Sequence, residues 1–276
     1  MNTINCSGTL IDLTRPIVMG VLNVTPDSFY DGGAYTSLDA SFAKAERMIV
    51  DGAQIIDVGG MSSRPGAEII DEKEEMSRVV PVIRKIKTIY PDQIISIDTV
   101  HGAVAKAAID VGASIINDIS AGSIDPSIVD VSVAERVPYI LMHMQGAPSD
   151  MQLNPTYNNV VMDILSYFKN KVFELRKRGL HDIIIDPGFG FGKTVEQNYS
   201  LLSKLSVFKI LDCPLMIGLS RKSMIYKPLQ IDPENALNGT TAAHMVALRN
   251  GASILRVHDV REAVQAINIH DLVLRN

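Results

Sequence analysis

The stretch IVMGVLNVTPDSFYDGG, residues 17–33, decides the predicted fold because it joins an apolar strand to a polar loop. It begins as a continuous apolar run, reaches Asn23, and breaks at Pro26 into a loop that ends in two glycines. Strands of this kind are usually covered on both faces, so their polar groups emerge at the strand end. The stretch therefore predicts a buried strand that delivers polar side chains to a mobile loop.

The same pattern recurs along the chain. The predicted strands cover residues 17–24, 54–59, 94–98, 113–117, 138–143, 182–186, 214–219 and 253–257. Segments with helical spacing of apolar residues lie between or after them, at 38–51, 71–89, 102–111, 126–136, 158–178, 195–210, 233–250 and 259–269. Gly112, Gly179 and Gly251 stand where glycines that end helices belong. Regular alternation of strand and helix indicates parallel βαβ units.

Eight such units predict an α/β protein with a (β/α)8 TIM barrel in a single domain, residues 17–276. Residues 1–16 are expected to form a short N-terminal plug or hairpin that caps the barrel bottom. The alternative is an open doubly wound sheet. That fold usually carries a glycine-rich dinucleotide fingerprint, which is missing here, and eight is the strand count that barrel closure demands. No Ser/Gly-rich linker divides the chain.

Composition limits the classes of partner. With 46% hydrophobic and 21% charged residues among 276, the chain has the make-up of a folded protein with a sizeable core. Its net charge of −5 gives no general attraction to nucleic acid or to anionic membranes, so an anionic ligand needs a local cluster of cations. Two distant cysteines, Cys6 and Cys213, fit a reducing compartment. With no signal peptide and no run of membrane-spanning length, we expect a cytoplasmic protein.

Polar residues end nearly all the predicted strands. They are Asn23, Asp57, Asp98, Asn117, His143, Asp186, the run Ser220-Arg221-Lys222, and Arg256 with His258. Any one of them alone could simply mark where a buried strand meets solvent. Barrel enzymes, however, place their chemistry at the carboxyl ends of the strands. As a set, these residues predict a site at that rim.

Residue spacing sharpens the prediction. Arg256 and His258 differ by two positions and point to the same side of an extended chain, as do Ser220 and Lys222. A guanidinium beside an imidazole makes a good anion site, because Arg offers a planar fork of donors to phosphate oxygens. Asn23 offers a neutral oxygen that could help hold Mg²⁺ shared with ligand phosphates.

Two other motifs carry less weight. The run DPGFGFGKT, residues 186–194, looks like a phosphate loop, but the required first glycine is Pro187 and the spacing also fails the dinucleotide pattern. We therefore expect neither ATP nor NAD. The loop MSSRPGAE, residues 61–68, carries Arg64 before Pro65, which fits either a binding loop or an ordinary solvated turn.

Eight motifs in order closely resemble the dihydropteroate synthase family. They are NVTPDSF (23–29), SSRPGA (62–67), SIDT (96–99), INDISAG (116–122), MHMQG (142–146), DPGFGFGKT (186–194), SRKS (220–223) and RVHDV (256–260). The resemblance runs over nearly the whole chain. Members of this family are (β/α)8 barrels that join a pterin to 4-aminobenzoate on the folate pathway.

The resemblance implies a transferase that displaces diphosphate from (7,8-dihydropterin-6-yl)methyl diphosphate by an SN1-like path. The implied catalytic residues are Asp31, Arg64, Lys222, Arg256 and His258. The implied pterin-binding residues are Asp98, Asn117, Met142, Asp186 and Lys222. Diphosphate would be bound by Asn23 with Mg²⁺, Arg64, Arg256 and His258. The 4-aminobenzoate site would consist of Phe29, Ser63, Arg64, Pro65, Phe191, Lys222 and Ser223. Sulfonamides as competitive inhibitors and a homodimer are also implied.

Two alternative functions were weighed against this one. A pterin-binding methyltransferase of the same superfamily would keep Asp98, Asn117 and Asp186 but has no use for the loop residues or for SRKS. A non-catalytic pterin-binding paralogue is disfavoured because the chain retains Arg64 and the cations at the strand ends. Two departures from the family pattern stand out. Met61 replaces the usual Glu and Ser63 the usual Thr, so we expect the chemistry to survive, while the pattern leaves loop closure and sulfonamide sensitivity open.

Overall fold

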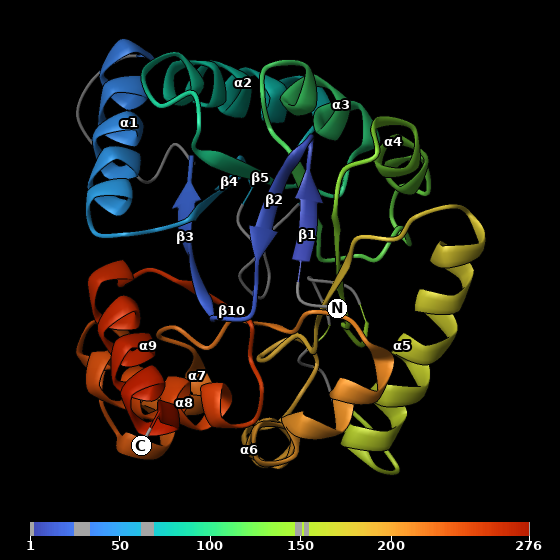
Figure 1. Cartoon of the computed structure of the whole chain (residues 1–276), viewed down its shortest axis with the longest axis vertical. Helices are drawn as coiled ribbons and strands as arrows, with labels where there is room; N and C mark the ends of the chain where they lie inside the picture. Colours follow the sequence, from blue (N-terminus) through green and yellow to red (C-terminus); the bar gives the residue numbers. More distant parts are fainter. Residues whose placement is uncertain (1–2, 25–33, 62–68, 147–150, 152–154, 276) are drawn as a thin grey trace.

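The computed structural model describes residues 3–24, 34–61, 69–146, 151 and 155–275, with residues 34–37 described as backbone only. Parallel strands curl into a barrel that helices surround (Figure 1). The barrel strands are β3 (Ile17–Asn23), β4 (Ile55–Gly59), β5 (Ile94–Asp98), β6 (Ile115–Asp118), β7 (Tyr139–Met142), β8 (Ile183–Asp186), β9 (Met216–Ile217) and β10 (Ile254–Val257). They are hydrogen-bonded in the order β8-β7-β6-β5-β4-β3-β10-β9.

The two ends of this sheet meet. A single parallel bridge joins Ile185 of β8 to Leu215, just before β9, and the Ile185 N–H donates to the Pro214 carbonyl at 2.9 Å. The sheet is therefore a nearly closed barrel. The predicted (β/α)8 fold is confirmed, and the open doubly wound sheet is excluded because its edge strands would lie apart.

Helices follow one another around the outside of the barrel (Figure 1). They are α1 (Ala34–Val50), α2 (Glu72–Ile89), α3 (Gly102–Asp110), α4 (Ser127–Glu135), α5 (Val160–Lys177), α6 (Val195–Ser203), α7 (Ser223–Leu229), α8 (Leu237–Arg249) and α9 (Val260–Arg275), with the 3-10 helices η2 (Leu205–Leu211) and η3 (Pro233–Asn235). Within the described part of the chain, no helix combines the length and apolar character that crossing a membrane requires.

The helices differ in detail from the predicted segments. The segment predicted at 195–210 divides into α6 and η2, and the one at 233–250 divides into η3 and α8. Helix α7 was not predicted, because its few residues include Pro228 and show no extended helical period. The last helix also continues past 269, as far as Arg275.

Alternation along the strands divides the core into two parts. Residues such as Val18, Ile56 and Leu255 point outward and pack in the large cluster beneath the helices. Their neighbours Met19, Ile55 and Ile254 point inward and fill the lower barrel in a second cluster. A pleated strand places successive side chains on opposite faces, which is why strands that read as continuous apolar runs serve both clusters. The part of the barrel interior near the carboxyl ends of the strands is therefore left for polar groups.

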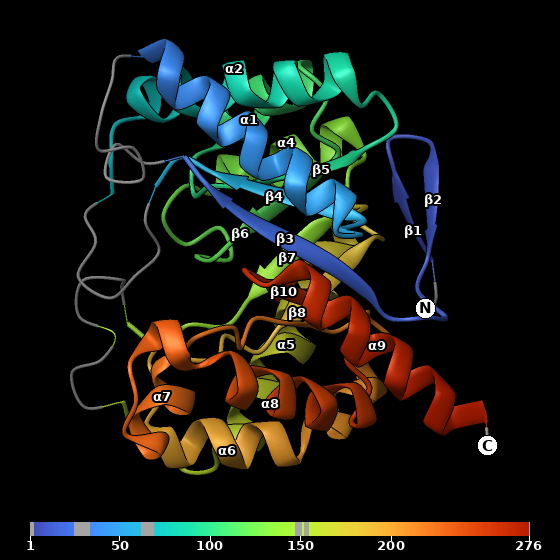
Figure 2. The same ribbon diagram turned by 90° about the vertical axis from the view of Figure 1, so that its left-hand side faces the viewer.

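An N-terminal hairpin covers the barrel end where the strands begin. Its strands are β1 (Thr3–Cys6) and β2 (Thr9–Asp12), paired antiparallel. Ile4 and Cys6 are buried in the inner cluster beside the first residues of several barrel strands. Figure 2 shows the hairpin at the end of the barrel away from the tip of the β3 arrow. The opposite end, where the polar residues gather, is the mouth of the barrel.

Candidate active site

The predicted strand-end residues meet at the mouth. Across neighbouring strands, Asn23 pairs in register with Gly59, Gly59 with Asp98, and Asp98 with Asn117. These residues therefore form one row over β3 to β6. Their inward direction follows from parity, because Ile115 and Ile55, two and four residues before Asn117 and Gly59, belong to the inner cluster.

Arg256 is the centre of a charged network in the mouth. Its Nε donates to Asp57 Oδ2 at 2.7 Å and its Nη2 donates to Asp98 Oδ2 at 2.6 Å. Asn117 Nδ2 donates to the same Asp57 oxygen at 2.9 Å. Asp57 is fully buried, and its second oxygen has no hydrogen-bond partner among the described residues. Asp57, predicted only as a strand-end residue, therefore orients Arg256.

Burial shifts the protonation of these groups. Burial, with a smaller contribution from the Asp57 carboxylate, raises the pKa of Asp98 to about 7 against the opposing charge of Arg256. Burial would also lower the pKa of Arg256, but the attraction of Asp57 and Asp98 outweighs it and keeps the guanidinium charged. Asp98 can therefore exist in either protonation state near neutral pH, next to a permanent cation.

Asp186 and Lys222 are two further charged groups in the mouth, and each influences the pKa of the other. Asp186 Oδ1 accepts the Gly188 N–H at 2.8 Å, and no described residue donates to its other oxygen. Burial raises the pKa of Asp186, and the ammonium of Lys222 opposes that rise. Lys222 Nζ donates to the Phe189 carbonyl at 2.6 Å and lies 4.7 Å from the centre of the Phe191 ring. Burial lowers the pKa of Lys222 to about 8, against the attraction of Asp186.

His258 lies at the exposed edge of the mouth. Its backbone N–H donates to Ser220 Oγ at 3.2 Å, and its Nδ1 lies 3.1 Å from the same oxygen. Loss of hydration and the positive charges of Arg256 and Lys44 lower the pKa of His258 to about 4. The imidazole is therefore neutral at pH 7 and can take up a proton when an anion binds beside it. Ser220, predicted as a rim residue, thus orients the His258 ring.

One wall of the mouth is apolar. Its buried members are Met61, Val100, Ile119, Met142, Met151 and Phe191. Met142 and Phe191 were predicted to contact the pterin and the 4-aminobenzoate, respectively. Met61 packs into the same cluster, so the side chain that stands in place of the family's usual Glu is anchored by apolar contacts rather than by charge.

The remaining predictions have mixed outcomes. Asn23 is half-buried, and its amide has no hydrogen bond within the described residues. Ser223 is half-buried at the first position of α7. The predicted residues Phe29, Asp31, Ser63, Arg64 and Pro65 lie outside the described residues.

His143 does not join the ring of polar residues at the mouth, which corrects the sequence analysis. Its ring packs edge-on against Tyr167 with centroids 4.9 Å apart, and its Nδ1 lies 3.2 Å from Lys193 Nζ. His143 follows Met142, which belongs to the apolar wall of the mouth, so parity sends the two side chains in opposite directions. It supports the mouth from outside.

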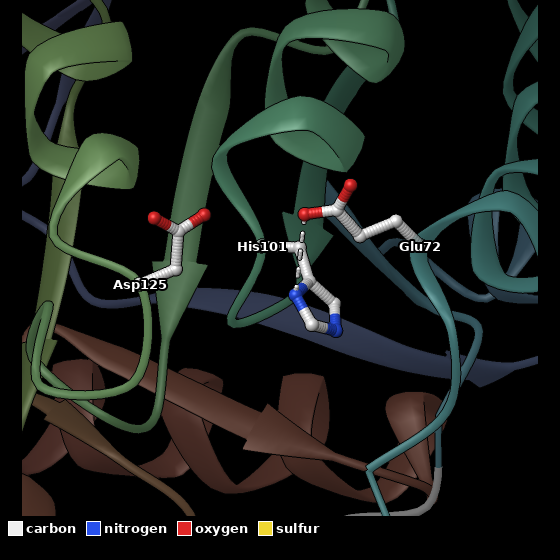
Figure 3. Close-up of side chains that lie close together, drawn as sticks. All are labelled: Glu72, His101 and Asp125. Atoms are coloured by element: carbon white, nitrogen blue, oxygen red, sulfur yellow. Dashed lines mark ion pairs between the residues drawn. The ribbon is translucent and has the colours of Figure 1, made fainter.

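Within the described ranges, the group of His and carboxylate side chains close enough to share an ion is Glu72, His101 and Asp125 (Figure 3). These lie at or before the starts of α2, α3 and α4 rather than at strand ends. His101 Nδ1 is 3.7 Å from Glu72, and the Asp125 oxygens accept hydrogen bonds from Gly102 and Ser127. An ion pair and helix-start hydrogen bonds account for this group.

The sequence and the fold have close counterparts among known proteins. A sequence model of the family described as "pterin binding enzyme" matches residues 19–258. The dihydropteroate synthase of Escherichia coli is 44% identical over 97% of this chain and 95% of its own length. The Xanthomonas albilineans dihydropteroate synthase solved with 4-aminobenzoic acid is 38% identical, with a TM-score of 0.93 over 100% of this chain and 99% of that one. The Yersinia pestis enzyme solved with a sulfonamide drug is 40% identical, also with a TM-score of 0.93, over 99% and 100% of the two chains.

A ring of polar side chains at the mouth of a (β/α)8 barrel and a match over most of the chain define the class of protein. The chain belongs to the pterin-binding enzymes and, among them, to the dihydropteroate synthases. It is therefore a transferase. The methyltransferase and the non-catalytic paralogue weighed above are set aside by this result.

Proposed function

We propose that the mouth condenses (7,8-dihydropterin-6-yl)methyl diphosphate with 4-aminobenzoate by a dissociative path. The observation that supports this most is the convergence of Asp98, Asn117, Asp186 and Lys222 near the cation of Arg256, at the mouth of the barrel. A pterin edge alternates hydrogen-bond donors and acceptors, and these four side chains offer acceptors and donors to match it.

The pterin ring is oriented by carboxylate, amide and ammonium groups. The free oxygen of Asp186 accepts from the ring amino group and the adjacent ring N–H, because one carboxylate can receive two such bonds. Lys222 is already fixed by the Phe189 carbonyl and donates to a ring acceptor. Because the pKa of Asp98 lies at about 7, this side chain can either accept a hydrogen bond from a ring N–H as a carboxylate or donate one to a ring nitrogen as a carboxylic acid. Met142 provides an apolar face for the ring.

The diphosphate is held at the outer edge of the mouth. Arg256 uses Nε and Nη2 on carboxylates, and no described residue accepts from its Nη1, which is left for a phosphate oxygen. Loss of hydration, together with the charges of Arg256 and Lys44, lowers the pKa of His258 to about 4, and an anionic diphosphate beside the ring opposes this shift and favours the protonated imidazole. Arg64 and Asp31 are proposed to complete this subsite from the loops outside the described residues.

Magnesium fits the donor set of the mouth. The Asn23 amide oxygen has no partner among the described residues and stands next to the proposed diphosphate subsite, and Mg²⁺ commonly takes one protein oxygen together with waters and phosphates. When bound there, the ion supplies positive charge to the leaving group.

The reaction then needs little base catalysis. The bond between the pterin methylene carbon and the bridging diphosphate oxygen breaks, and its electron pair leaves with the diphosphate. The conjugated pterin spreads the positive charge, and the neutral amine of 4-aminobenzoate attacks the methylene carbon and then loses a proton. Arg256 and His258 stabilise the charge that develops on the leaving group, which is commonly the largest catalytic effect in a dry site.

The second substrate is proposed to bind beside Lys222. The Lys222 ammonium lies over the Phe191 ring, and Ser223 is the first residue of helix α7. The rest of this subsite is proposed to come from four residues that lie outside the described part of the chain, namely Phe29, Ser63, Arg64 and Pro65. Because a sulfonamide drug occupies the similar Yersinia pestis enzyme, we further propose that sulfonamides compete with 4-aminobenzoate here.

Two further properties are proposed. Both cysteines are free, which supports a cytoplasmic location. Exposed apolar side chains on the neighbouring helices α8 and α9, such as Val246 and Ile269, support a homodimer.

Positional isotope exchange tests the dissociative path. The pterin diphosphate carries ¹⁸O at the bridging position and is incubated with enzyme and Mg²⁺ but without 4-aminobenzoate. If the carbon–oxygen bond breaks reversibly in the mouth, the label scrambles into non-bridging positions of recovered substrate, as ³¹P NMR detects. Retention of the label at the bridge, while the full reaction proceeds when 4-aminobenzoate is added, would contradict the dissociative path and favour direct displacement.

A further inference from the structure

The loop between β8 and α6 encloses a buried lysine. Lys193 is 3% exposed, and its ammonium donates to the carbonyls of Gly188 and Phe191 at 2.9 Å each. His143 Nδ1 lies 3.2 Å from the same nitrogen. All its hydrogen-bond partners among the described residues are neutral acceptors. Burying a charge without a direct ion pair costs free energy, so this arrangement needs a compensating role.

The loop around Lys193 is built to turn carbonyl groups inward. Gly188, Gly190 and Gly192 have φ values of +69°, +79° and +61°, in the region that favours glycine. A Cβ atom on Gly188 would collide with the His143 carbonyl oxygen. The loop therefore lies backbone against backbone on the segment after β7, and the ammonium of Lys193 joins the two segments.

The other side of this loop faces the mouth. The Gly188 N–H holds Asp186 Oδ1 at 2.8 Å, and the Phe189 carbonyl holds Lys222 Nζ at 2.6 Å. Phe191 lies under the Lys222 ammonium. Lys193 thus binds the carbonyls of the turn at residues 188–191. The same turn fixes Asp186 and Lys222, the two charged side chains that are proposed to recognise the pterin.

We infer that Lys193 is a positioning residue for pterin binding, which acts through the turn at residues 188–191 on Asp186 and Lys222. This inference rests on the pterin-binding role proposed above. The protonated amine draws the Gly188 and Phe191 carbonyls together, which sets the Gly188 N–H against Asp186 and the Phe189 carbonyl against Lys222. Its charge also favours the ionised form of Asp186, the form that accepts two hydrogen bonds from the ring.

The charge of Lys193 should be visible in a pH profile. Burial lowers its pKa to about 7, Asp186 opposes the shift and Lys222 adds to it. The other groups against it are His143, whose pKa burial lowers to about 3, and Tyr157, whose hydroxyl is bonded to Gly192. If the charged amine favours pterin binding, affinity is full below about pH 7 and falls as pH rises through that value. Lys222 adds a second fall near its own pKa of about 8.

Calorimetric titration with 6-hydroxymethyl-7,8-dihydropterin tests the inference. Lys193→Met keeps the length of the side chain but removes its charge and donors, and we expect about tenfold weaker binding at low pH, the size of one charge-assisted hydrogen bond. Because Asp98 also titrates near pH 7 in both proteins, the Lys193 contribution is the difference between the two profiles, which should show a fall near pH 7 in the wild type that the variant lacks and no difference near pH 8. Lys193→Gln, which keeps a neutral donor, serves if the methionine variant does not fold, and the same loss of the pH 7 step is expected.

Two matched variants make the result specific. Thr194→Ala removes the capping box of α6 next to Lys193 and destabilises the same region without changing a charge, so its pH profile should match the wild type. Equal losses of affinity in Thr194→Ala and Lys193→Met, or an unchanged pH 7 step in both Lys193 variants, would overturn the inference. Asp186→Asn distinguishes a failure of the proposed pterin site from a failure of the Lys193 inference. If Asp186→Asn binds the pterin normally, the proposed pterin site is wrong. If Asp186→Asn binds it weakly but both Lys193 variants bind it normally, only the role of Lys193 is wrong.

Discussion

Replacing Asp186 by Asn is expected to weaken pterin binding by about 100-fold or more, because two charge-assisted hydrogen bonds are lost together. The substitution preserves the shape of the side chain and the contact from Gly188. It places an amide N–H or a weaker acceptor opposite the ring donors. Calorimetry with the bare dihydropterin measures this directly, and turnover should fall in parallel at subsaturating substrate.

A matched control lies at the other end of the same strand. Asp182 precedes β8 near the barrel bottom and accepts a long hydrogen bond of 3.3 Å from the Asn5 backbone. Asp182→Asn keeps an oxygen for that bond and should leave pterin affinity unchanged. If Asp186→Asn binds the pterin within about threefold of the wild type, a difference smaller than one neutral hydrogen bond, the proposed ring contact is wrong.

Replacing Arg256 by Ala is expected to lower affinity for the pterin diphosphate about 100-fold while lowering affinity for the bare pterin by less than about tenfold. The guanidinium is the cation that the geometry assigns to the leaving group, and its free Nη1 has no equivalent in Ala. The change also leaves Asp57 and Asp98 unpaired in a buried site, at a cost of about 3–5 kcal/mol in unfolding free energy. Arg256→Lys retains a positive charge beside Asp57 and Asp98 and therefore tests how much of the effect comes from leaving these carboxylates unpaired.

The control for Arg256 is an exposed arginine nearby in sequence. Arg261 on α9 is paired with Asp51 at the surface, so Arg261→Ala should change neither affinity. The comparison of the two ligands is what decides the role of Arg256. Equal losses for the diphosphate and for the bare pterin would show that Arg256 supports the ring pocket through Asp57 and Asp98 and does not bind the leaving group.

Most of the barrel could be predicted from sequence because its strands are long apolar runs with polar ends. The apolar run of residues 17–22 and the Asn at 23 correspond to β3 almost residue for residue. The short helix α7 could not be predicted, since a seven-residue element containing Pro228 has no periodic signal. The same limit explains why η2 was joined to α6.

The site was predicted less completely than the fold. Position at the end of a strand correctly placed Asp98 and Asn117 in the mouth, but the same criterion included His143, which strand parity, applied one residue beyond Met142, directs outward. The pairing of Arg256 with Asp57 spans 199 positions, and it exists only because β10 closes the barrel beside β3. Lys193 stood inside a motif rejected as a phosphate loop, and its burial depends on glycine conformations that the sequence does not specify.

The most direct measurement of the central claim is the release of pyrophosphate by the purified protein mixed with the dihydropterin diphosphate, 4-aminobenzoate and Mg²⁺. Dihydropteroate should be detected by chromatography in the same molar amount as the pyrophosphate. Both products should require both substrates, and both should fall sharply with Asp186→Asn and Arg256→Ala. Absence of pyrophosphate release, under conditions where calorimetry shows that both substrates bind, would contradict the assignment of this mouth as a dihydropteroate synthase active site.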